Sequence, residues 1–68
     1  MITYDPFWET LKQKGITQYK LLNDYNFSHG TLSALKQNKS ITMATLNSLM
    51  NMLEIEDVTQ IIRYIPDK

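Results

Sequence analysis

The stretch from residue 28 to residue 40 is dense in side chains that donate or accept hydrogen bonds or carry positive charge. Hydroxyl, amide and imidazole groups can pair with the edges of nucleic-acid bases, and lysine ammonium groups can pair with phosphates. The candidate residues of this stretch, together with one glutamine that precedes it, are Gln18, Ser28, His29, Thr31, Ser33, Lys36, Gln37, Asn38, Lys39 and Ser40; Gly30 lies among them but has no side chain to contribute. Their chemistry predicts binding to a nucleic acid.

Catalytic and metal-binding arrangements are not evident in the sequence. The chain has no cysteine and a single histidine, His29, with no acidic cluster near it. A zinc site would need several such ligands, and a nucleophile would need a neighbouring base. The crowded acids Glu54, Glu56 and Asp57 fit a solvated helix junction. We therefore predict no enzyme activity, no cofactor, no metal and no small-molecule ligand, and His29 is either a nucleic-acid contact or a solvated residue.

Two short helices joined by a tight turn would position the candidate residues. Thr17 and Ser28 can each cap a helix, because a hydroxyl there accepts a hydrogen bond from a free backbone N–H. Ser28 follows Thr17 by eleven residues, which fits the dimensions of a helix-turn-helix. Asn26 tolerates the left-handed backbone that a sharp turn needs. The apolar residues recur at three- and four-residue spacing and predict one inward surface made of Leu21, Leu22, Tyr25, Phe27, Leu32 and Leu35.

A further helix is predicted before this unit. Asp5 suits the N-cap and Pro6 suits the first helical position, where a missing N–H costs nothing. Gly15 would end the helix. Phe7 and Trp8 are expected in the core rather than at a ligand.

A fourth helix is predicted after Ser40. Thr42 would cap it, and Met52 would lie on its surface. The buried face expected from helical spacing consists of Met43, Leu46, Leu49, Met50 and Leu53. Two of the methionines are thus interpreted as core filler rather than as a binding groove.

The C-terminal segment fits two interpretations. Asp57 begins a pattern that resembles a capping box for a short last helix over residues 57 to 61. The isoleucines that follow fit one helical face, but the alternation of Ile62 and Tyr64 with other residues fits a strand. We expect a short helix that gives way to an extended segment, which could pair with residues 2 to 4.

Length and composition limit the class of protein. Sixty-eight residues make one small domain, residues 1–68, and a chain of this size buries only about 60% of its unfolded surface. The lack of cysteine excludes disulfides and suits a reducing cytoplasm. No apolar stretch approaches the roughly 18 residues of a membrane span, and no signal-peptide pattern begins the chain. We expect a cytoplasmic domain without membrane contact, with dimerisation as a further source of stability.

The charge is zero overall but unevenly distributed. From Lys12 to Ser40 there are five lysines and one acid, a balance of +4, and each flank carries −2. Such asymmetry predicts a basic face on a neutral protein. The alternative is a set of ordinary solubilising lysines.

The spacing resembles the Cro and phage-repressor helix-turn-helix family, also called the xenobiotic-response-element class. The similarity rests on Thr17, Gln18, Leu21, Asn26, Phe27, Ser28, Thr31, Leu32, Ser33, Leu35, Asn38, Lys39, Leu46 and Leu49. The run from Asn38 to Met43 and the ending Tyr-Ile-Pro-Asp further resemble a small stand-alone bacterial and phage branch. The resemblance implies an all-α, five-helix DNA-binding domain, usually dimeric, to which this sequence adds short extended segments at both termini.

The resemblance also implies roles for the candidate residues. Gln18 matches a glutamine that braces the recognition helix and touches a phosphate. Residues 28 to 33 match the opening of the recognition helix, and residues 37 to 40 match the loop that grips the DNA backbone. Gly30 leaves no side chain at a position that often contacts bases, and Lys36 replaces a frequent acid.

We therefore expect a sequence-specific regulator of transcription, a repressor that binds double-stranded DNA as a homodimer. The base contacts would come from His29, Thr31, Ser33 and Lys36. The alternative is a protein-interaction module on the same fold, such as an antitoxin or an anti-repressor. Zero net charge and an apolar C-terminal tail favour this alternative.

Overall fold

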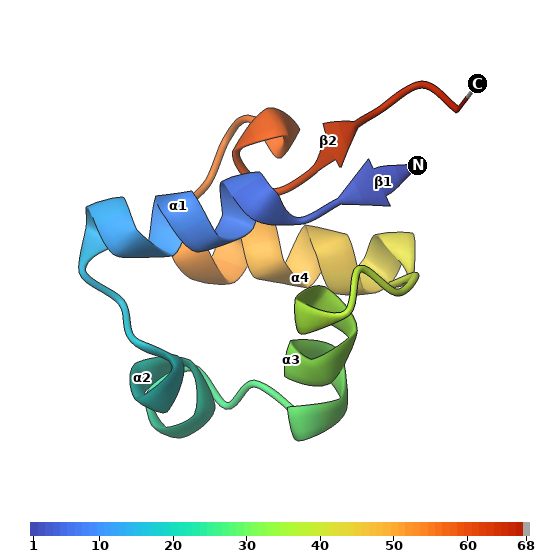
Figure 1. Cartoon of the computed structure of the whole chain (residues 1–68). Helices are drawn as coiled ribbons and strands as arrows, with labels where there is room; N and C mark the ends of the chain where they lie inside the picture. The colour runs from blue at the N-terminus through green and yellow to red at the C-terminus, as the bar shows by residue number, and fades with distance from the viewer. Residues whose placement is uncertain (68) are drawn as a thin grey trace.

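The computed structural model describes residues 1–67 and is mostly helical (Figure 1). Its elements in chain order are β1 (Ile2–Thr3), α1 (Asp5–Lys14), α2 (Gln18–Asn23), α3 (His29–Lys36), α4 (Met43–Leu53), the 3-10 helix η1 (Val58–Gln60) and β2 (Arg63–Tyr64). In Figure 1, α1 passes across α4, and α2 and α3 lie below both. No helix within the described residues has the length and apolar character needed to cross a bilayer.

Three α-helices begin as the sequence predicts. Thr17, Ser28 and Thr42 precede α2, α3 and α4 with extended backbone, and each hydroxyl accepts a hydrogen bond from the backbone N–H three residues on. The bonds measure between 3.0 and 3.2 Å. Each cap satisfies a donor that the helix itself cannot.

The start of α1 differs from the prediction by one residue. Tyr4 is the N-cap, no side chain caps this helix, and Asp5 is the first helical residue. The Asp5 carboxylate instead accepts a hydrogen bond from the Thr3 hydroxyl at 3.3 Å and lies 3.9 Å from the Arg63 guanidinium. The carboxylate therefore contacts one residue of each strand and does not cap the helix. Its negative charge still stabilises the N-terminal end of α1 through the helix dipole.

A left-handed residue follows each α-helix. Gly15 (φ 69°) and Asn26 (φ 56°) take this conformation as expected. Asn38 (φ 55°) and Glu54 (φ 56°) do the same after α3 and α4. Glu54 was not predicted, because glutamate carries the steric cost of this conformation without the local hydrogen bonding that helps asparagine.

The predicted five-helix count is not confirmed, because residues 1–67 contain four α-helices, with a three-residue 3-10 helix in place of the fifth. Asp57 caps η1, and the Thr10 hydroxyl of α1 donates to the Gln60 carbonyl at 2.7 Å. The chain must then straighten at once, because β2 pairs with β1. This antiparallel pairing matches Ile2 with Tyr64 and Thr3 with Arg63, which confirms the extended segments expected at the two ends.

The core lies where the helices meet. Phe7 is fully buried and packs edge-on against Trp8, with ring centroids 5.0 Å apart, and stacks on Phe27 at 6.3 Å. Leu21, Leu35 and Ile61 are also fully buried. The contact between Phe7 and Phe27 ties α1 to the segment that leads into α3.

Two methionines of α4 differ from the prediction. Met43 is 75% exposed rather than buried, because it is the first helical residue and lies at the open end of α4. Met52 is half-buried and packs against the core rather than lying on the surface. Met50 packs against the core, as expected.

Candidate nucleic-acid interface

The segment before α3, residues 26–28, is called here the lead-in. Asn26 reverses the chain with its positive φ, and Phe27 is buried. The Ser28 hydroxyl accepts from the Thr31 backbone N–H at 3.0 Å and donates to the Thr31 hydroxyl at 2.8 Å. Both hydrogen bonds of the Ser28 side chain run to a residue three positions away, so the cap at the start of α3 is local in sequence.

The helix α3 has a clearly divided surface. Leu32 and Leu35 are buried, and Thr31 and Ala34 are half-buried. The exposed residues are His29, Gly30, Ser33, Lys36 and Gln37, the last of them the C-cap. At 3.6 residues per turn, these five positions fall within an arc of roughly 120°. The exposed arc is uncharged and polar except for Lys36, and Ser33 lies at its centre.

Thr31 does not share that arc. It lies on the nearly opposite side of α3 from Ser33 and lines a hollow between the start of α3 and α4, with Thr45, Ser48 and Met52. Its hydroxyl already accepts a hydrogen bond from Ser28. The candidates at the opening of α3 therefore divide into an exposed group and a residue that braces the helix start.

Gln37 and Ser33 are linked along the exposed arc. The Gln37 Nε2 donates to the Ser33 Oγ at 3.0 Å. The serine keeps its own O–H donor, and the glutamine keeps its carbonyl acceptor and a second N–H. Two donors and one acceptor thus remain free side by side, and a donor next to an acceptor suits an adenine edge.

The loop after α3, residues 37–40, is called here the exit loop. The Lys39 backbone N–H donates to the Ala34 carbonyl at 2.9 Å, across the left-handed Asn38. This is the Schellman arrangement that satisfies the last carbonyls of a helix. Lys39 and Ser40 are exposed beyond it.

Tyr4 braces the exit loop from the other end of the chain. Its backbone N–H donates to the Asn38 Oδ1 at 3.0 Å, and its phenol donates to the Lys39 carbonyl at 2.6 Å. Tyr4 is only 4% exposed. Sequence reasoning did not identify Tyr4, because the contact spans 34 residues and no local pattern indicates it. Part of the Asn38 side chain is accordingly occupied within the protein.

Gln18 occupies the first position of α2 and is exposed. Thr17 caps the same helix, so its hydroxyl is turned to the Lys20 N–H. Gln18 lines a shallow hollow with Trp8 and Lys12. The Gln18 side chain is thus open to solvent and lines the same hollow as Lys12 of α1.

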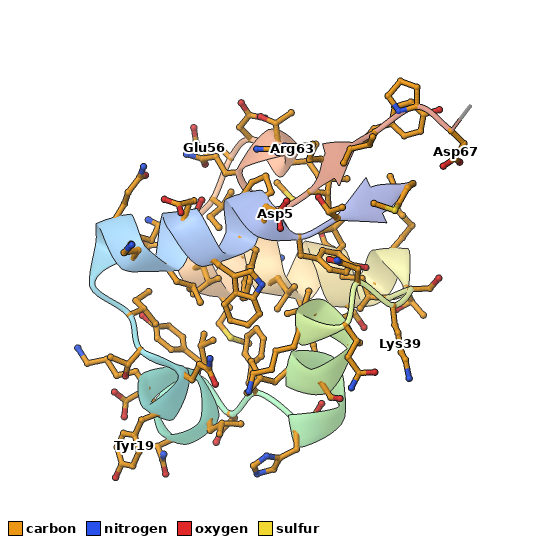
Figure 2. All side chains as sticks on the ribbon, in the orientation of Figure 1. Asp5, Tyr19, Lys39, Glu56, Arg63 and Asp67 are labelled. Atoms are coloured by element: carbon orange, nitrogen blue, oxygen red, sulfur yellow. The ribbon has the colours of Figure 1, made fainter. Side chains whose placement is uncertain are left out.

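The charges separate along the molecule. All five lysines between residues 12 and 39 are exposed. In Figure 2 the labelled acids Asp5, Glu56 and Asp67 lie toward the end with the strands and η1, away from Tyr19 and Lys39. The separation is incomplete, because Asp24 and Glu54 line one hollow with Lys14 and Lys20. Of the five lysines, Lys36 and Lys39 are therefore the ones best separated from acidic side chains.

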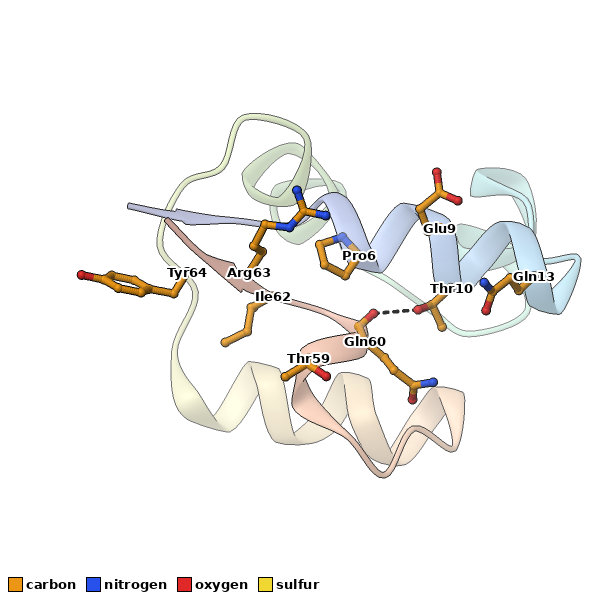
Figure 3. Close-up of a pocket in the computed structure, with 9 residues that line it drawn as sticks. All are labelled: Pro6, Glu9, Thr10, Gln13, Thr59, Gln60, Ile62, Arg63 and Tyr64. Carbon is orange, nitrogen blue, oxygen red and sulfur yellow. Dashed lines mark hydrogen bonds between the residues drawn. The ribbon is translucent and has the colours of Figure 1, made fainter. Parts of the chain in front are cut away.

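A larger hollow lies between α1 and β2 (Figure 3). It measures about 590 Å³ and is lined by Pro6, Glu9, Thr10, Gln13, Thr59, Gln60, Ile62, Arg63 and Tyr64. The figure shows the Thr10–Gln60 hydrogen bond across it. It is wide open to solvent and mixes single charges of both signs, so it lacks the convergent polar groups of a binding site. Within residues 1–67, no three His, Cys, Asp or Glu side chains are close enough to hold a metal.

Comparison with known proteins gives one finding. A family described as the Cro/C1-type HTH DNA-binding domain matches residues 7–67. No curated protein and no solved structure matches the chain. The matched range contains α2, the lead-in, α3 and the exit loop.

Proposed function

The chain belongs to the Cro/C1-type helix-turn-helix family of DNA-binding domains, and from this premise we propose that it is a sequence-specific repressor of transcription that binds double-stranded DNA as a dimer. The proposal rests on one observation above all, the exposed polar arc of α3. The major groove of B-DNA is about 12 Å wide and admits an α-helix. Leu32 and Leu35 anchor the back of this helix in the core, so the arc is presented on a rigid support.

The exposed residues take distinct roles in this proposal. His29 and Ser33 face the base edges, with Gln37 paired to Ser33. Gly30 allows the backbone to approach the groove closely, because it has no side chain there. Lys36 lies at the far end of the arc, where a base or a phosphate is within reach.

Phosphate contacts come from the elements on either side of α3. The proposed contacts on the far side are Lys39, Ser40 and the free part of Asn38, and on the near side Gln18 and the amides around Ser28. These contacts fix position and supply affinity that depends on salt. Thr31 is predicted from the sequence to contact a base, whereas its half-buried place beside Ser28 favours a bracing role.

Repression would be steric. Two copies on half-sites roughly 34 Å apart would cover one face of the duplex for two turns. The domain measures 40 × 23 × 19 Å, so a pair of this size would exclude polymerase from an overlapping promoter.

The proposal is tested by fluorescence anisotropy of a labelled random-sequence duplex at about 50 and 200 mM salt. We expect binding that weakens steeply between the two salt concentrations. Lys39→Ala should reduce the slope of log K against log salt by about one unit, because one phosphate contact is lost. Arg63→Ala is the matched control, since it removes one exposed positive charge from the strand end of the molecule (Figure 2). Equal effects of the two substitutions would contradict a localised interface.

The second candidate function is a protein-interaction module, either an antitoxin or an anti-repressor. Exposed apolar side chains at the strand end favour it, in particular Tyr64 and Ile65, which are 65% and 39% exposed. Absence of DNA binding at either salt concentration would favour this candidate, and a pull-down would follow.

A further inference from the structure

Large apolar side chains are exposed together where the strands meet the start of α4. Met43 is 75% exposed, Tyr64 is 65% exposed and Ile2 is 43% exposed. Ile2 and Tyr64 are directly paired across the two strands, so their side chains lie on the same face of the ribbon. Ile2 and Met43 line one hollow. We call the surface of Ile2, Ile41, Met43, Ile62 and Tyr64 the Tyr64 face.

The hollow in this face is the size of an aromatic ring. It measures about 160 Å³ and is lined by Ile2, Tyr4, Ser40, Ile41, Met43, Leu46 and Ile62. A cavity of about 150 Å³ with apolar walls accepts a benzene molecule. The face therefore presents both an exposed aromatic ring, Tyr64, and a hollow that fits such a ring.

A surface that carries a knob and a matching hole is complementary to itself. In a twofold dimer the same patch meets its copy, and each residue contact occurs twice. We propose that the Tyr64 face is a self-association surface, in which Tyr64 of each copy enters the hollow of the other. Tyrosine suits this place, because its ring buries apolar area and its hydroxyl can stay wet at the rim.

The size of the face indicates a weak dimer. Side chains of this size present on the order of 200 Å² when fully exposed, so the exposed fractions correspond to roughly 400 Å² per copy. This is close to a tenth of the 4773 Å² of accessible surface of the chain, the share that a small protein usually commits to an interface. Two copies would bury less than the roughly 1,200 Å² of a stable complex, so association should be concentration-dependent.

The arrangement leaves the exposed arc of α3 uncovered. None of its residues belongs to the Tyr64 face, whereas Ser40 of the exit loop lines the hollow. Dimerisation through this face would thus place the two exit loops beside the twofold axis, with both α3 helices still open. Its use on DNA rests on the proposed function, but self-association itself does not.

Sedimentation velocity without DNA tests the proposal, over roughly 10 µM to 1 mM protein. We expect a reversible monomer–dimer equilibrium in this range. Tyr64→Ser should weaken it on the order of tenfold or more, because an aromatic anchor is lost. Tyr19→Ser is the matched control, since Tyr19 is 73% exposed on α2, far from the strands (Figure 2). Both tyrosines are exposed, so both variants should fold, as circular dichroism would verify.

Three outcomes would overturn the proposal. The first is a wild-type chain that stays monomeric at about 1 mM, which would indicate that the Tyr64 face binds a different protein. The second is a Tyr64→Ser variant that dimerises as strongly as the wild type. The third is a Tyr19→Ser variant that loses dimerisation to the same extent as Tyr64→Ser. A second step uses a duplex with two half-sites, on which Tyr64→Ser should keep half-site binding and lose cooperativity. Failure of the wild type to bind DNA would refute the proposed function while leaving the sedimentation result intact.

Discussion

The lead-in and the exit loop hold the two ends of α3, and they differ in where their hydrogen bonds come from. The lead-in is braced by Ser28 and Thr31, which are three residues apart. The exit loop is braced by Tyr4, from 34 and 35 residues away. The side-chain hydrogen bonds at the start of the candidate DNA-binding helix are therefore local in sequence, whereas those at its exit loop come from the far end of the chain.

The largest expected difference in the free energy of unfolding is between substitutions of two asparagines that share a left-handed backbone. Asn26 and Asn38 both have φ near 55°, a conformation that glycine adopts without cost. Asn26→Gly should change the free energy of unfolding by no more than about 0.5 kcal/mol. Asn38→Gly should lower it by about 1–3 kcal/mol, because the backbone N–H of the buried Tyr4 loses its acceptor. Urea denaturation of both variants measures the difference, and equal effects would show that the long-range brace contributes nothing.

The same contrast explains what the sequence could predict. The caps at Thr17, Ser28 and Thr42 were predicted because a cap depends on residues within one helical turn. The turn at Asn26 and the end at Gly15 were predicted for the same reason.

Features that depend on tertiary contacts were missed. The role of Tyr4 arises from groups that meet only in the folded chain, and the Asp5 carboxylate, which does not cap α1, faces the distant Arg63 as well as its neighbour Thr3. In the structure Thr31 is half-buried and Ser33 is exposed on a different side of α3. From the sequence alone both are polar residues near a helix start and are equivalent candidates for base contacts. Met43 is exposed although its spacing places it on the buried stripe, because it is the first residue of α4.

The second prediction concerns the role of the two hydroxyls on opposite sides of α3. Ser33→Ala should reduce discrimination at one base pair by about 1 kcal/mol on a selected operator, and should leave stability unchanged. Thr31→Ala removes the acceptor of the Ser28 hydroxyl and should lower stability by about 0.5–1 kcal/mol. Its affinity should fall equally on all sequences. Binding to an operator and to its single-base variants, together with urea denaturation, separates the two roles.

Loss of base preference in Thr31→Ala alone would reverse the assignment. That result would support the sequence-based prediction that Thr31 contacts a base. It would also mean that the O–H of Thr31 reaches the base, because the Thr31 hydroxyl only accepts from Ser28 in the free protein and keeps its own donor.

A third comparison isolates the long-range brace from general stability. Tyr4→Phe removes the phenol bond to the Lys39 carbonyl, and Thr10→Val removes the hydroxyl bond to the Gln60 carbonyl on the far side of α1. Each should lower the free energy of unfolding by about 1 kcal/mol. Only Tyr4→Phe should weaken DNA binding, by about two- to fivefold, because it frees the loop that carries Lys39. Anisotropy at low salt measures this, and equal weakening by Thr10→Val would attribute the effect to stability alone.

The smallest expected effect concerns a third local brace, the cap of η1, which differs from the caps of the α-helices in carrying charge. Hydrogen bonds from the Thr59 hydroxyl, at 2.7 Å, and from its backbone N–H lower the pKa of the Asp57 carboxyl below its ordinary value. A group whose pKa is lowered by folding stabilises the native state above its ordinary pKa, and that contribution is lost as the pH falls through the lowered value. The contribution is small, because the carboxylate is fully exposed to solvent.

Thermal unfolding of Asp57→Ala and Ser28→Ala between pH 7 and about pH 2.5 compares a charged cap with a neutral one. The difference in Tm between the wild type and Asp57→Ala should narrow as the pH falls below about 4, because the wild-type carboxylate becomes protonated and a neutral acid is a weaker acceptor. The difference for Ser28→Ala should stay constant, because the Ser28 hydroxyl does not titrate in this range. If both differences stay constant, then the charge of the Asp57 carboxylate adds nothing to the cap, and the protonated acid stabilises η1 equally well. If the Tm differences of both variants narrow, then acid weakens the cap of η1 and the cap at Ser28 together. The lead-in would then depend on the rest of the fold as much as the exit loop does.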